Sequence, residues 1–335
     1  MKIWESGGTG TLGKELVSQV YDQADRIVIY SRDEAKQALM GVDFPEYPDN
    51  KIRYHIGDVR DYRRVRESMS GCDIVIHTAA LKRIDTCESN VFEAESINVQ
   101  GTINVVRAAI DLGIKKLVFI STDKACMSVS TYGDCKALCE KIVTNANNYG
   151  QTNCYCVRYG NVLGSRGSVL GIWEDQVKAG KPVTVTDTRM TRFFWAIKDA
   201  AKFILDTLPV ADRGVIYVPK MRKYRIMDMA KLESSNIVET GLRCTEKLHE
   251  DLISPNEGMH TYDEGRWYAI HPVLPAWGGS KPKGDILNEP VTSYIKENAD
   301  DKPTFHSTEA LPVPVPASKG KTKGSKHLAQ VNAKL

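Results

Sequence analysis

Three glycines spaced three residues apart, Gly7, Gly10 and Gly13, follow a short β-favouring segment at the start of the chain. A helical pattern comes next, with Leu16 and Val17 on its apolar face. In a strand–turn–helix unit, such glycines allow a tight turn, a close approach of the backbone to a pyrophosphate and close packing of the helix. The loop therefore predicts a dinucleotide site at the first strand of a parallel α/β sheet. The expected contacts are Gly7, Thr9, Gly10, Thr11, Leu12 and Gly13.

Apolar, β-favouring segments alternate with helical patterns over the first half of the chain. This alternation predicts the α/β class, a doubly wound parallel sheet of the Rossmann type with a smaller α/β substrate lobe. We expect residues 1–161 to form an NADP-binding domain with the active site, 162–300 a substrate lobe that partly returns to the main sheet, and 301–335 a disordered basic tail. In the lobe, a helix is expected to start at 246–250. Glu5 does not fit the first strand, because a buried carboxyl is costly unless it is paired.

The residues after the second predicted strand bear on the choice of cofactor. In NAD binders an acidic residue ends this strand and holds the ribose 2′-hydroxyl. Here Ser31 and Arg32 come first, and a hydroxyl and a guanidinium suit a 2′-phosphate, which favours NADP over NAD. The alternative for this pair is an ordinary charged helix start, and the alternative for Asp58 is a helix N-cap. The other expected cofactor contacts are Asp33, Glu34, Lys36, Gln37, Asp58, Val59, Ala79, Ala80, Lys82, Tyr132 and Lys136.

Reactive side chains gather after the fifth predicted strand. Thr122, Asp123 and Lys124 end that strand, and Tyr132 and Lys136 are spaced to share one face of the next helix. A lysine ammonium beside a phenol lowers the pKa of the phenol from about 10. Tyr132 would then accept a proton from a substrate hydroxyl while a hydride leaves the same carbon. The Tyr-x-x-x-Lys spacing alone is more often a solvated helix face, but its place at a strand end of this fold favours a site.

Composition and charge exclude several other classes of function. A net charge of +3 over 335 residues is too small to argue for nucleic acid binding. No apolar run approaches the ~18 residues of a membrane helix, and the N-terminus has no room for a signal peptide, so we expect a cytoplasmic protein. None of the eight cysteines forms a C-x-x-C pair, which favours buried thiols over a metal site, and no metal is expected.

With these residues assembled, the chain resembles the extended short-chain dehydrogenase/reductase superfamily. More narrowly it resembles the inverting UDP-N-acetylglucosamine 4,6-dehydratases of pseudaminic acid biosynthesis. The deciding detail is Thr122-Asp123-Lys124, because the retaining dehydratases typically have Thr-Asp-Glu there and the 4-epimerases lack the acid/base pair. The family usually has Asn-Pro where this chain has Cys126-Met127-Ser128, which puts substrate fit in question more than chemistry. The resemblance covers about residues 1–280 and is carried by residues 7–13, 79–82, 121–136, 158–169, 190–193 and 246–250.

The resemblance implies a hydro-lyase that removes water across C5–C6 of UDP-N-acetylglucosamine and inverts C5, for surface glycan or pseudaminic acid synthesis. Tyr132, helped by Lys136, would take the O4 proton as C4 passes its hydride to NADP⁺, while Thr122 holds O4. Lys124 would take the C5 proton, for which it needs a pKa lowered by Lys136 or by desolvation. Asp123 would protonate the departing 6-hydroxyl. Expected substrate contacts are Lys82, Thr122, Asn161, Val162, Ser165, Arg166 and Lys247.

Two other functions remain open at this point. One is a UDP-sugar 4-epimerase, or a retaining 4,6-dehydratase on another UDP-sugar, and product analysis separates these from inverting dehydration. The other is a non-catalytic NADP-binding module, since the same fold serves many functions. The presence of Asp123, Lys124, Tyr132 and Lys136 together favours an enzyme. The family resemblance also implies a homo-oligomer, a dimer or larger.

Overall fold

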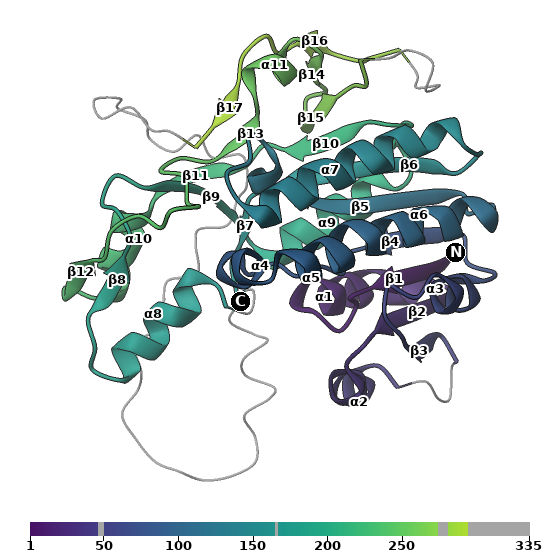
Figure 1. The fold of residues 1–335 in the computed structure, drawn as a ribbon, viewed down its shortest axis with the longest axis horizontal. Helices are drawn as coiled ribbons and strands as arrows, with labels where there is room; N and C mark the ends of the chain where they lie inside the picture. The colour runs from purple at the N-terminus through teal and green to yellow at the C-terminus, as the bar shows by residue number, and fades with distance from the viewer. Residues whose placement is uncertain (46–49, 165–166, 274–280, 294–335) are drawn as a thin grey trace.

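A computed structural model describes residues 1–45, 50–164, 167–273 and 281–293 of the chain. Strands and helices alternate through its first half (Figure 1). Their bounds are β1 Lys2–Ser6, α1 Thr11–Val20, β2 Arg26–Ser31, α2 Glu34–Asp43, β3 Ile52–Ile56, α3 Tyr62–Met69, β4 Ile74–His77, α4 Ile84–Ser89, α5 Val91–Glu95, α6 Gly101–Asp111, β5 Lys116–Thr122, α7 Thr131–Asn145 and β6 Asn153–Tyr159. Two predicted substrate contacts, Ser165 and Arg166, and the predicted tail of residues 301–335 lie outside the described residues.

The second half contains shorter elements. Their bounds are β7 Asn161–Val162, α8 Val169–Lys178, β8 Val183–Val185, β9 Thr191–Trp195, α9 Ile197–Thr207, β10 Ile216–Pro219, β11 Arg222–Arg225, α10 Ile226–Glu233, β12 Ile237–Glu239, β13 Asp251–Ile253, α11 Pro255–Gly258, β14 Thr261–Asp263, β15 Trp267–Ile270, β16 Asp285–Ile286 and β17 Val291–Thr292. Helices α8 and α10 lie with β8 and β12 at the opposite side of the molecule from β1, β2 and β3 (Figure 1).

A ten-stranded sheet forms the centre of the protein, in the order β16-β14-β15-β10-β6-β5-β4-β1-β2-β3. The strands from β3 through β10 in this order pair in parallel, and β14, β15 and β16 add to the sheet antiparallel. The predicted α/β class with a doubly wound parallel sheet is therefore confirmed. Because the order reverses beside β1, the carboxyl ends of β1 and β4 open a crevice of the kind that binds ligands in such sheets.

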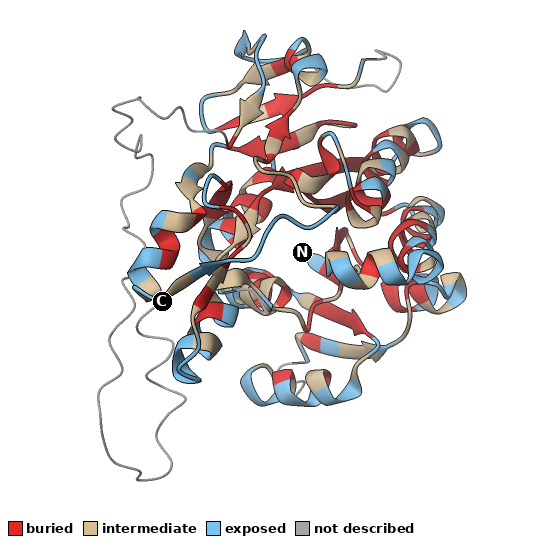
Figure 2. Ribbon diagram, turned by 60° about the vertical axis from the view of Figure 1, so that its left-hand side comes forward, coloured by how far each residue is buried: buried red, intermediate tan, exposed pale blue. Residues whose placement is uncertain are grey.

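Helices cover both faces of the sheet, so its central strands are buried on both sides (Figure 2). In β1, Ile3 packs with residues of α1 and α9, whereas the next residue, Trp4, packs with residues of α3. Parallel strands covered on both faces are expected to be apolar at nearly every position. A separate apolar cluster around Trp173 and Phe194 forms the core of the part that contains α8 and α10.

The single long helix suggested by the apolar spacing around residues 92–110 is interrupted. Between α5 and α6, residues Ser96–Gln100 form a π-helical turn. Its Asn98 side chain accepts a hydrogen bond from the Leu81 N–H (2.8 Å) and donates one to the Leu81 carbonyl (3.0 Å). Such turns are frequent at functional sites. Here the turn fixes the loop that carries Ala79, Ala80 and Lys82.

The helix predicted to start at 246–250 is wrong, because the segment is irregular, bends at Leu248 and His249, and leads into β13. The buried Arg192 guanidinium donates to the carbonyls of Lys247 (2.8 Å) and Leu248 (3.0 Å). The Thr191 N–H also donates to the Leu248 carbonyl (3.3 Å). These carbonyls are therefore bound by β9 rather than by the N–H groups of a following helical turn.

Glu5 is buried in β1 with 1% of its surface exposed, and its Oε1 atom has no hydrogen-bond partner in the described part of the chain. Burial raises the pKa of this carboxyl well above its usual range. A Cβ atom at Gly8 would lie 3.4 Å from the Glu5 carboxyl carbon, so the group sits beneath the glycine loop. Glu5 is thus accommodated as a neutral acid rather than by an ion pair.

We predict that Glu5→Gln stabilises the protein at neutral and basic pH. A carboxyl whose pKa is raised by folding destabilises the folded state as pH rises above its unfolded value of about 4.3. At pH 8 the free energy of unfolding should rise by about 1–3 kcal/mol, and the gain should vanish near pH 4. Urea unfolding across this pH range measures the difference, with the exposed Glu34→Gln as the control. Equal stability of wild type and Glu5→Gln at pH 8 would contradict the prediction.

Candidate active site

The predicted reactive residues meet at the carboxyl end of β5 and the start of α7. Thr122 ends β5 and caps the short turn Asp123–Ala125, accepting a hydrogen bond from the Lys124 N–H (3.4 Å). Helix α7 begins at Thr131 because the Ser130 hydroxyl accepts from the Gly133 N–H (3.2 Å) at its first turn. The cap places Tyr132 in this first turn of α7.

Asp123 and Lys124 form a buried ion pair. Oδ1 of Asp123, a fully buried residue, accepts from Lys124 Nζ (2.9 Å) and from the Thr122 hydroxyl (2.9 Å). Oδ2 of Asp123 has no hydrogen-bond partner among the described residues and lies 3.3 Å from the place that a Cβ atom on Gly160 would take. A buried, unpartnered carboxylate oxygen is a position where a ligand hydroxyl can bind.

The pKa of Lys124 is raised, which corrects the expected lowering. Burial of its ammonium lowers the pKa, but the charges of Asp123 and Glu250 together outweigh that effect. Glu250 Oε1 lies 3.6 Å from Lys124 Nζ, and Asn161 Oδ1 lies 3.4 Å from it. Lys136, which was expected to repel this charge, is not among the main causes of the pKa shift. At neutral pH Lys124 is therefore an ammonium held between two carboxylates.

The Lys136 side chain contacts residues of β5. Its Nζ donates to the Ile120 carbonyl (2.7 Å) and lies 4.3 Å from the centre of the Phe119 ring. Burial lowers the pKa of Lys136 to about 8. Burial, followed by the charge of Asp123, raises the pKa of Tyr132, while a hydrogen bond with Thr122 lowers it. The expected lowering of the Tyr132 pKa is thus wrong for this structure, because burial of the phenol dominates.

The glycine loop has the geometry of an anion-binding turn. Gly7 has φ +73°, and a Cβ atom there would lie 2.7 Å from the Thr78 hydroxyl oxygen. A Cβ atom at Gly13 would lie 2.3 Å from the Gly8 carbonyl oxygen, so α1 packs tightly on the loop as predicted. In the described part of the chain, no side-chain hydrogen bond caps α1 at Gly10. Its N–H groups therefore fit a dinucleotide pyrophosphate.

At the end of β2, Ser31 and Arg32 have different surroundings. The buried Ser31 hydroxyl accepts from Gln37 Nε2 (3.0 Å), whereas the half-exposed Arg32 guanidinium lies 3.5 Å from the Asp58 carboxylate. Asp58 is bound more closely by Arg60 (2.7 Å). The alternative of Asp58 as a helix N-cap is wrong, because Asp61 caps α3. Of the pair expected to meet a 2′-phosphate, Arg32 is the one directed to the surface.

The second half of the chain reaches the site through Asn161 and Lys247. Asn161 lies in β7 with Val162, directly after β6, and contacts Lys124 as given above. Lys247 Nζ donates to the Cys126 carbonyl (2.7 Å) and lies 3.0 Å from Glu250 Oε2. This predicted substrate residue therefore contacts the loop between β5 and α7.

Three buried charged or polar residues near the site were not among the predicted site residues. Glu250 and Asn98 are described above. Arg158, in β6, binds both Glu140 of α7 (Nη2 to Oε2, 2.6 Å) and Glu257 of α11 (Nη2 to Oε1, 2.7 Å). Contacts between distant segments reveal these roles; the sequence signal that could have pointed to Arg158 and Glu250 is their place in the stretches 158–169 and 246–250, which carry the family resemblance.

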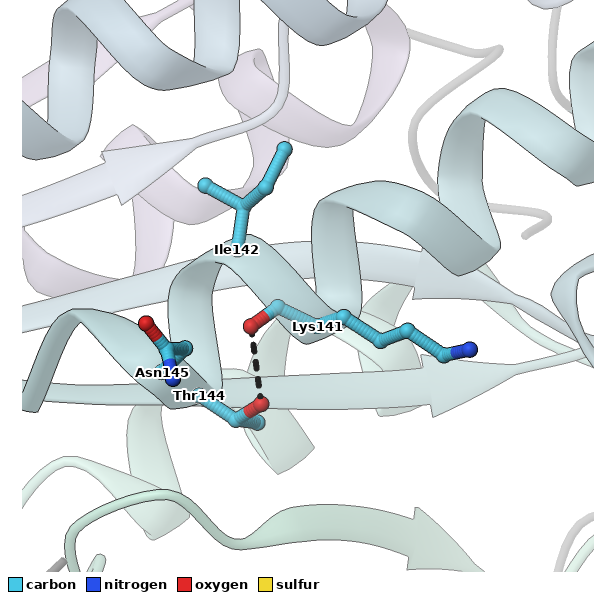
Figure 3. A pocket seen from close by; sticks show the side chains of 4 residues that line it. All are labelled: Lys141, Ile142, Thr144 and Asn145. Carbon is cyan, nitrogen blue, oxygen red and sulfur yellow. Dashed lines mark hydrogen bonds between the residues drawn. The ribbon is translucent and has the colours of Figure 1, made fainter.

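A hollow on α7 lies away from these residues. It is lined by Lys141, Ile142, Thr144 and Asn145, and within it the Thr144 hydroxyl donates to the Lys141 carbonyl (3.2 Å) (Figure 3). These residues belong to the second half of α7, beyond Lys136, and none of them is a predicted site residue. The candidate site is therefore defined by its buried charges rather than by this hollow. In the described part of the chain, no helix is long and apolar enough to cross a membrane.

Comparisons with known proteins give the family. The family described as "Polysaccharide biosynthesis protein" matches residues 3–272. A Campylobacter jejuni protein named UDP-N-acetylglucosamine 4,6-dehydratase (inverting) is 40% identical over 80% of this chain and 82% of its own. A Rickettsia canadensis protein named UDP-glucose 4-epimerase is 37% identical over 79% of this chain and 81% of its own. The predicted resemblance to the inverting dehydratases is confirmed.

Solved structures agree with the fold. The structure of Pen from Bacillus thuringiensis matches with a TM-score of 0.81 and 33% identity, over 87% of this chain and 92% of its own. The dTDP-glucose 4,6-dehydratase DesIV from Streptomyces venezuelae, solved with NAD and TYD bound, matches with a TM-score of 0.68 and 19% identity, over 74% and 87%. The latter likeness shows the shared fold alone.

The loop between β5 and α7 is strained at Met127, which has φ +45° and is half exposed. Asn tolerates such backbone better than Met does. We predict that Met127→Gly raises the free energy of unfolding by about 0.5–1 kcal/mol, because glycine lacks the Cβ that clashes. Met127→Ala keeps that Cβ and is the control, for which no gain is expected. Chemical denaturation measures the free energy of unfolding of both variants. A Met127→Gly variant less stable than the wild type would contradict the inference that the backbone at Met127 is strained.

Proposed function

The chain belongs to the polysaccharide biosynthesis protein family, and on this premise we propose that it is an inverting UDP-N-acetylglucosamine 4,6-dehydratase that uses a nicotinamide cofactor. The observation that carries the proposal is the Asp123–Lys124 ion pair at the end of β5, with Tyr132 near Asp123 and Thr122 and with Lys136 one turn further along α7. Dehydration needs an acid and a base close to the same sugar carbons, and these two groups provide both. Thr122, Asn161 and Lys247 surround the pair and are proposed to contact the UDP-sugar.

The charge state of the pair fits this chemistry. Elimination requires a neutral Lys124 to take the C5 proton and a protonated Asp123 to give a proton to the departing 6-hydroxyl. Transfer of one proton across the 2.9 Å contact converts the ion pair into these two forms without changing its total charge. After elimination, Lys124 is again an ammonium and Asp123 a carboxylate. Hydride then returns to C6, and a proton that reaches C5 on the face opposite Lys124 inverts that centre.

Tyr132 and Lys136 act on the C4 hydroxyl in this proposal. The bound nicotinamide supplies the hydride acceptor and later the hydride donor. Tyr132 accepts the O4 proton once it is ionised, and its hydrogen bond with Thr122 favours that ionisation. Lys136 supports the phenol from the next turn of α7, with its own proton held at the Ile120 carbonyl.

NADP is the proposed cofactor, bound mainly by residues 1–161, with the later residues forming the substrate lobe. The uncapped N-terminus of α1 and the glycine loop would hold the pyrophosphate. Arg32, half exposed at the end of β2, would meet the 2′-phosphate. The DesIV structure holds NAD, so NAD is the alternative, and titrating the protein with each dinucleotide decides between them.

The activity is tested by proton NMR of the protein with UDP-N-acetylglucosamine in D₂O. We expect a new methyl signal, deuterium at C5 and the couplings of an L-arabino 4-keto sugar. A methyl signal with D-xylo couplings would overturn the inversion but not the dehydration. The named Rickettsia relative makes a 4-epimerase the second candidate, and UDP-N-acetylgalactosamine without a methyl signal would establish it.

Lys124→Ala is predicted to lower the dehydration rate by about 10²–10⁴-fold, the usual contribution of a general base. Deuterium incorporation at C5 should be lost, while binding of UDP-N-acetylglucosamine changes by only a few-fold. The matched control is Lys178→Ala, which removes an exposed lysine of α8 and should leave the rate unchanged. Wild-type C5 exchange in Lys124→Ala would refute the proposed role of Lys124.

Self-association is proposed through α5 and α7, which pack against each other. Their outer surface exposes Val91, Phe92 and Leu138, and Phe92 is 92% exposed. A second copy covering these side chains would remove apolar surface from water. Phe92→Asp should therefore shift the protein towards the monomer in sedimentation velocity experiments, whereas Tyr149→Asp, beyond the end of α7, should shift it less. A monomeric wild type would contradict the proposal.

A further inference from the structure

Glu250 lies between two lysines of the proposed site. Its carboxylate is 3.6 Å from Lys124 Nζ through Oε1 and 3.0 Å from Lys247 Nζ through Oε2, the latter an ion pair without hydrogen-bond geometry. Only 3% of the Glu250 side chain is exposed. The mechanism above assigns it no role, yet a carboxylate in this position is costly unless its partners compensate for its burial.

The backbone around Glu250 is fixed on both sides. The Glu250 N–H donates to the Ser293 hydroxyl (2.8 Å), and the Ser293 N–H donates to the Glu250 carbonyl (2.7 Å). Two residues earlier, the Leu248 carbonyl accepts from Arg192 and from the Thr191 N–H, as described for the fold. The side chain is therefore directed at Lys124 by a rigid segment.

The charged and polar groups around Lys124 come from four different segments. Asp123 belongs to its own turn, Glu250 precedes β13, and the Arg192 guanidinium belongs to β9. The fourth is Asn161 of β7, whose neutral amide oxygen faces the ammonium. The neighbouring His249 is directed to the Thr191 hydroxyl instead (2.7 Å). Glu250 is thus the sole carboxylate that faces Lys124 from the second half of the described chain.

We propose that Glu250 is a positioning residue for Lys124: it holds the amine in place as a second carboxylate beside Asp123 and keeps it charged between proton transfers. This inference rests on the proposed dehydratase function. When Lys124 passes its proton to Asp123, Asp123 becomes neutral and Glu250 is the remaining anion beside the amine. Glu250 then favours recapture of a proton by Lys124, here the C5 proton, and its contact with Lys247 keeps it oriented during that step.

The proposal is tested with Glu250→Gln, which preserves shape and removes the charge. Losing this charge lowers the pKa of Lys124, so the neutral amine is available at lower pH. We expect the rising limb of the pH profile for C5 exchange to move at least about one unit to lower pH, with KM for UDP-N-acetylglucosamine within about three-fold. Glu250→Asp keeps the charge and should keep the wild-type midpoint. Glu239→Gln, an exposed carboxyl of β12, is the matched control and should not shift it.

A second measurement separates this inference from the proposed activity. Lysine labelled with ¹³C at Cε reports the titration of Lys124 by NMR in the free protein, with the signal assigned by its absence in Lys124→Met. A lowered Lys124 midpoint in Glu250→Gln supports the positioning role even where no dehydration is found. An unchanged midpoint and an unshifted profile would overturn it. A uniform loss of rate at every pH, with no shift, would also overturn it, since that is the effect of a merely structural residue.

Discussion

The buried carboxylate of Asp123 is the constraint on which the arrangement of the site depends. A charge without solvent around it must be compensated, and Lys124, the next residue, provides that compensation. The lysine is then itself a buried charge, and it is further compensated by Glu250, which in turn contacts Lys247. The result is a row of alternating charges that begins at the end of β5 and ends on the segment before β13. Each member has a defined position because its neighbours would otherwise be unpaired.

Much of the fold could be predicted from the sequence because its signals are local. The glycine spacing, the apolar strands and the Tyr132–Lys136 pair each occupy one short stretch, and the structure places these stretches in the expected elements. The irregular, non-helical form of residues 246–250 could not be predicted, because it depends on the Arg192 guanidinium, more than fifty positions away. The pattern of polar and apolar residues in 246–250, taken alone, is equally compatible with a helix.

The difference between local and long-range signals also explains why the pKa shifts of Lys124 and Tyr132 were predicted with the wrong sign. That Lys124 would sit near other charges followed from the sequence, but the sign of its pKa shift did not. The sign depends on whether a cation or an anion faces the ammonium, and Lys136 turned towards the Ile120 carbonyl whereas Glu250 turned towards Lys124. For Tyr132, the neighbouring lysine was known, but the depth of burial that raises its pKa was not.

Arg158 shows how far the two halves of the chain depend on each other. Its guanidinium is shared by Glu140 of α7 and Glu257 of α11, just as the Lys124 ammonium is shared by Asp123 and Glu250. In both cases one carboxylate comes from each side of the boundary near residue 161 that composition suggests. A fragment that ended there would retain both cations and lose half of the anions that compensate them. The predicted boundary therefore does not separate the charges of the site, and exchanging the two parts between relatives would require that these carboxylates be kept with their cations.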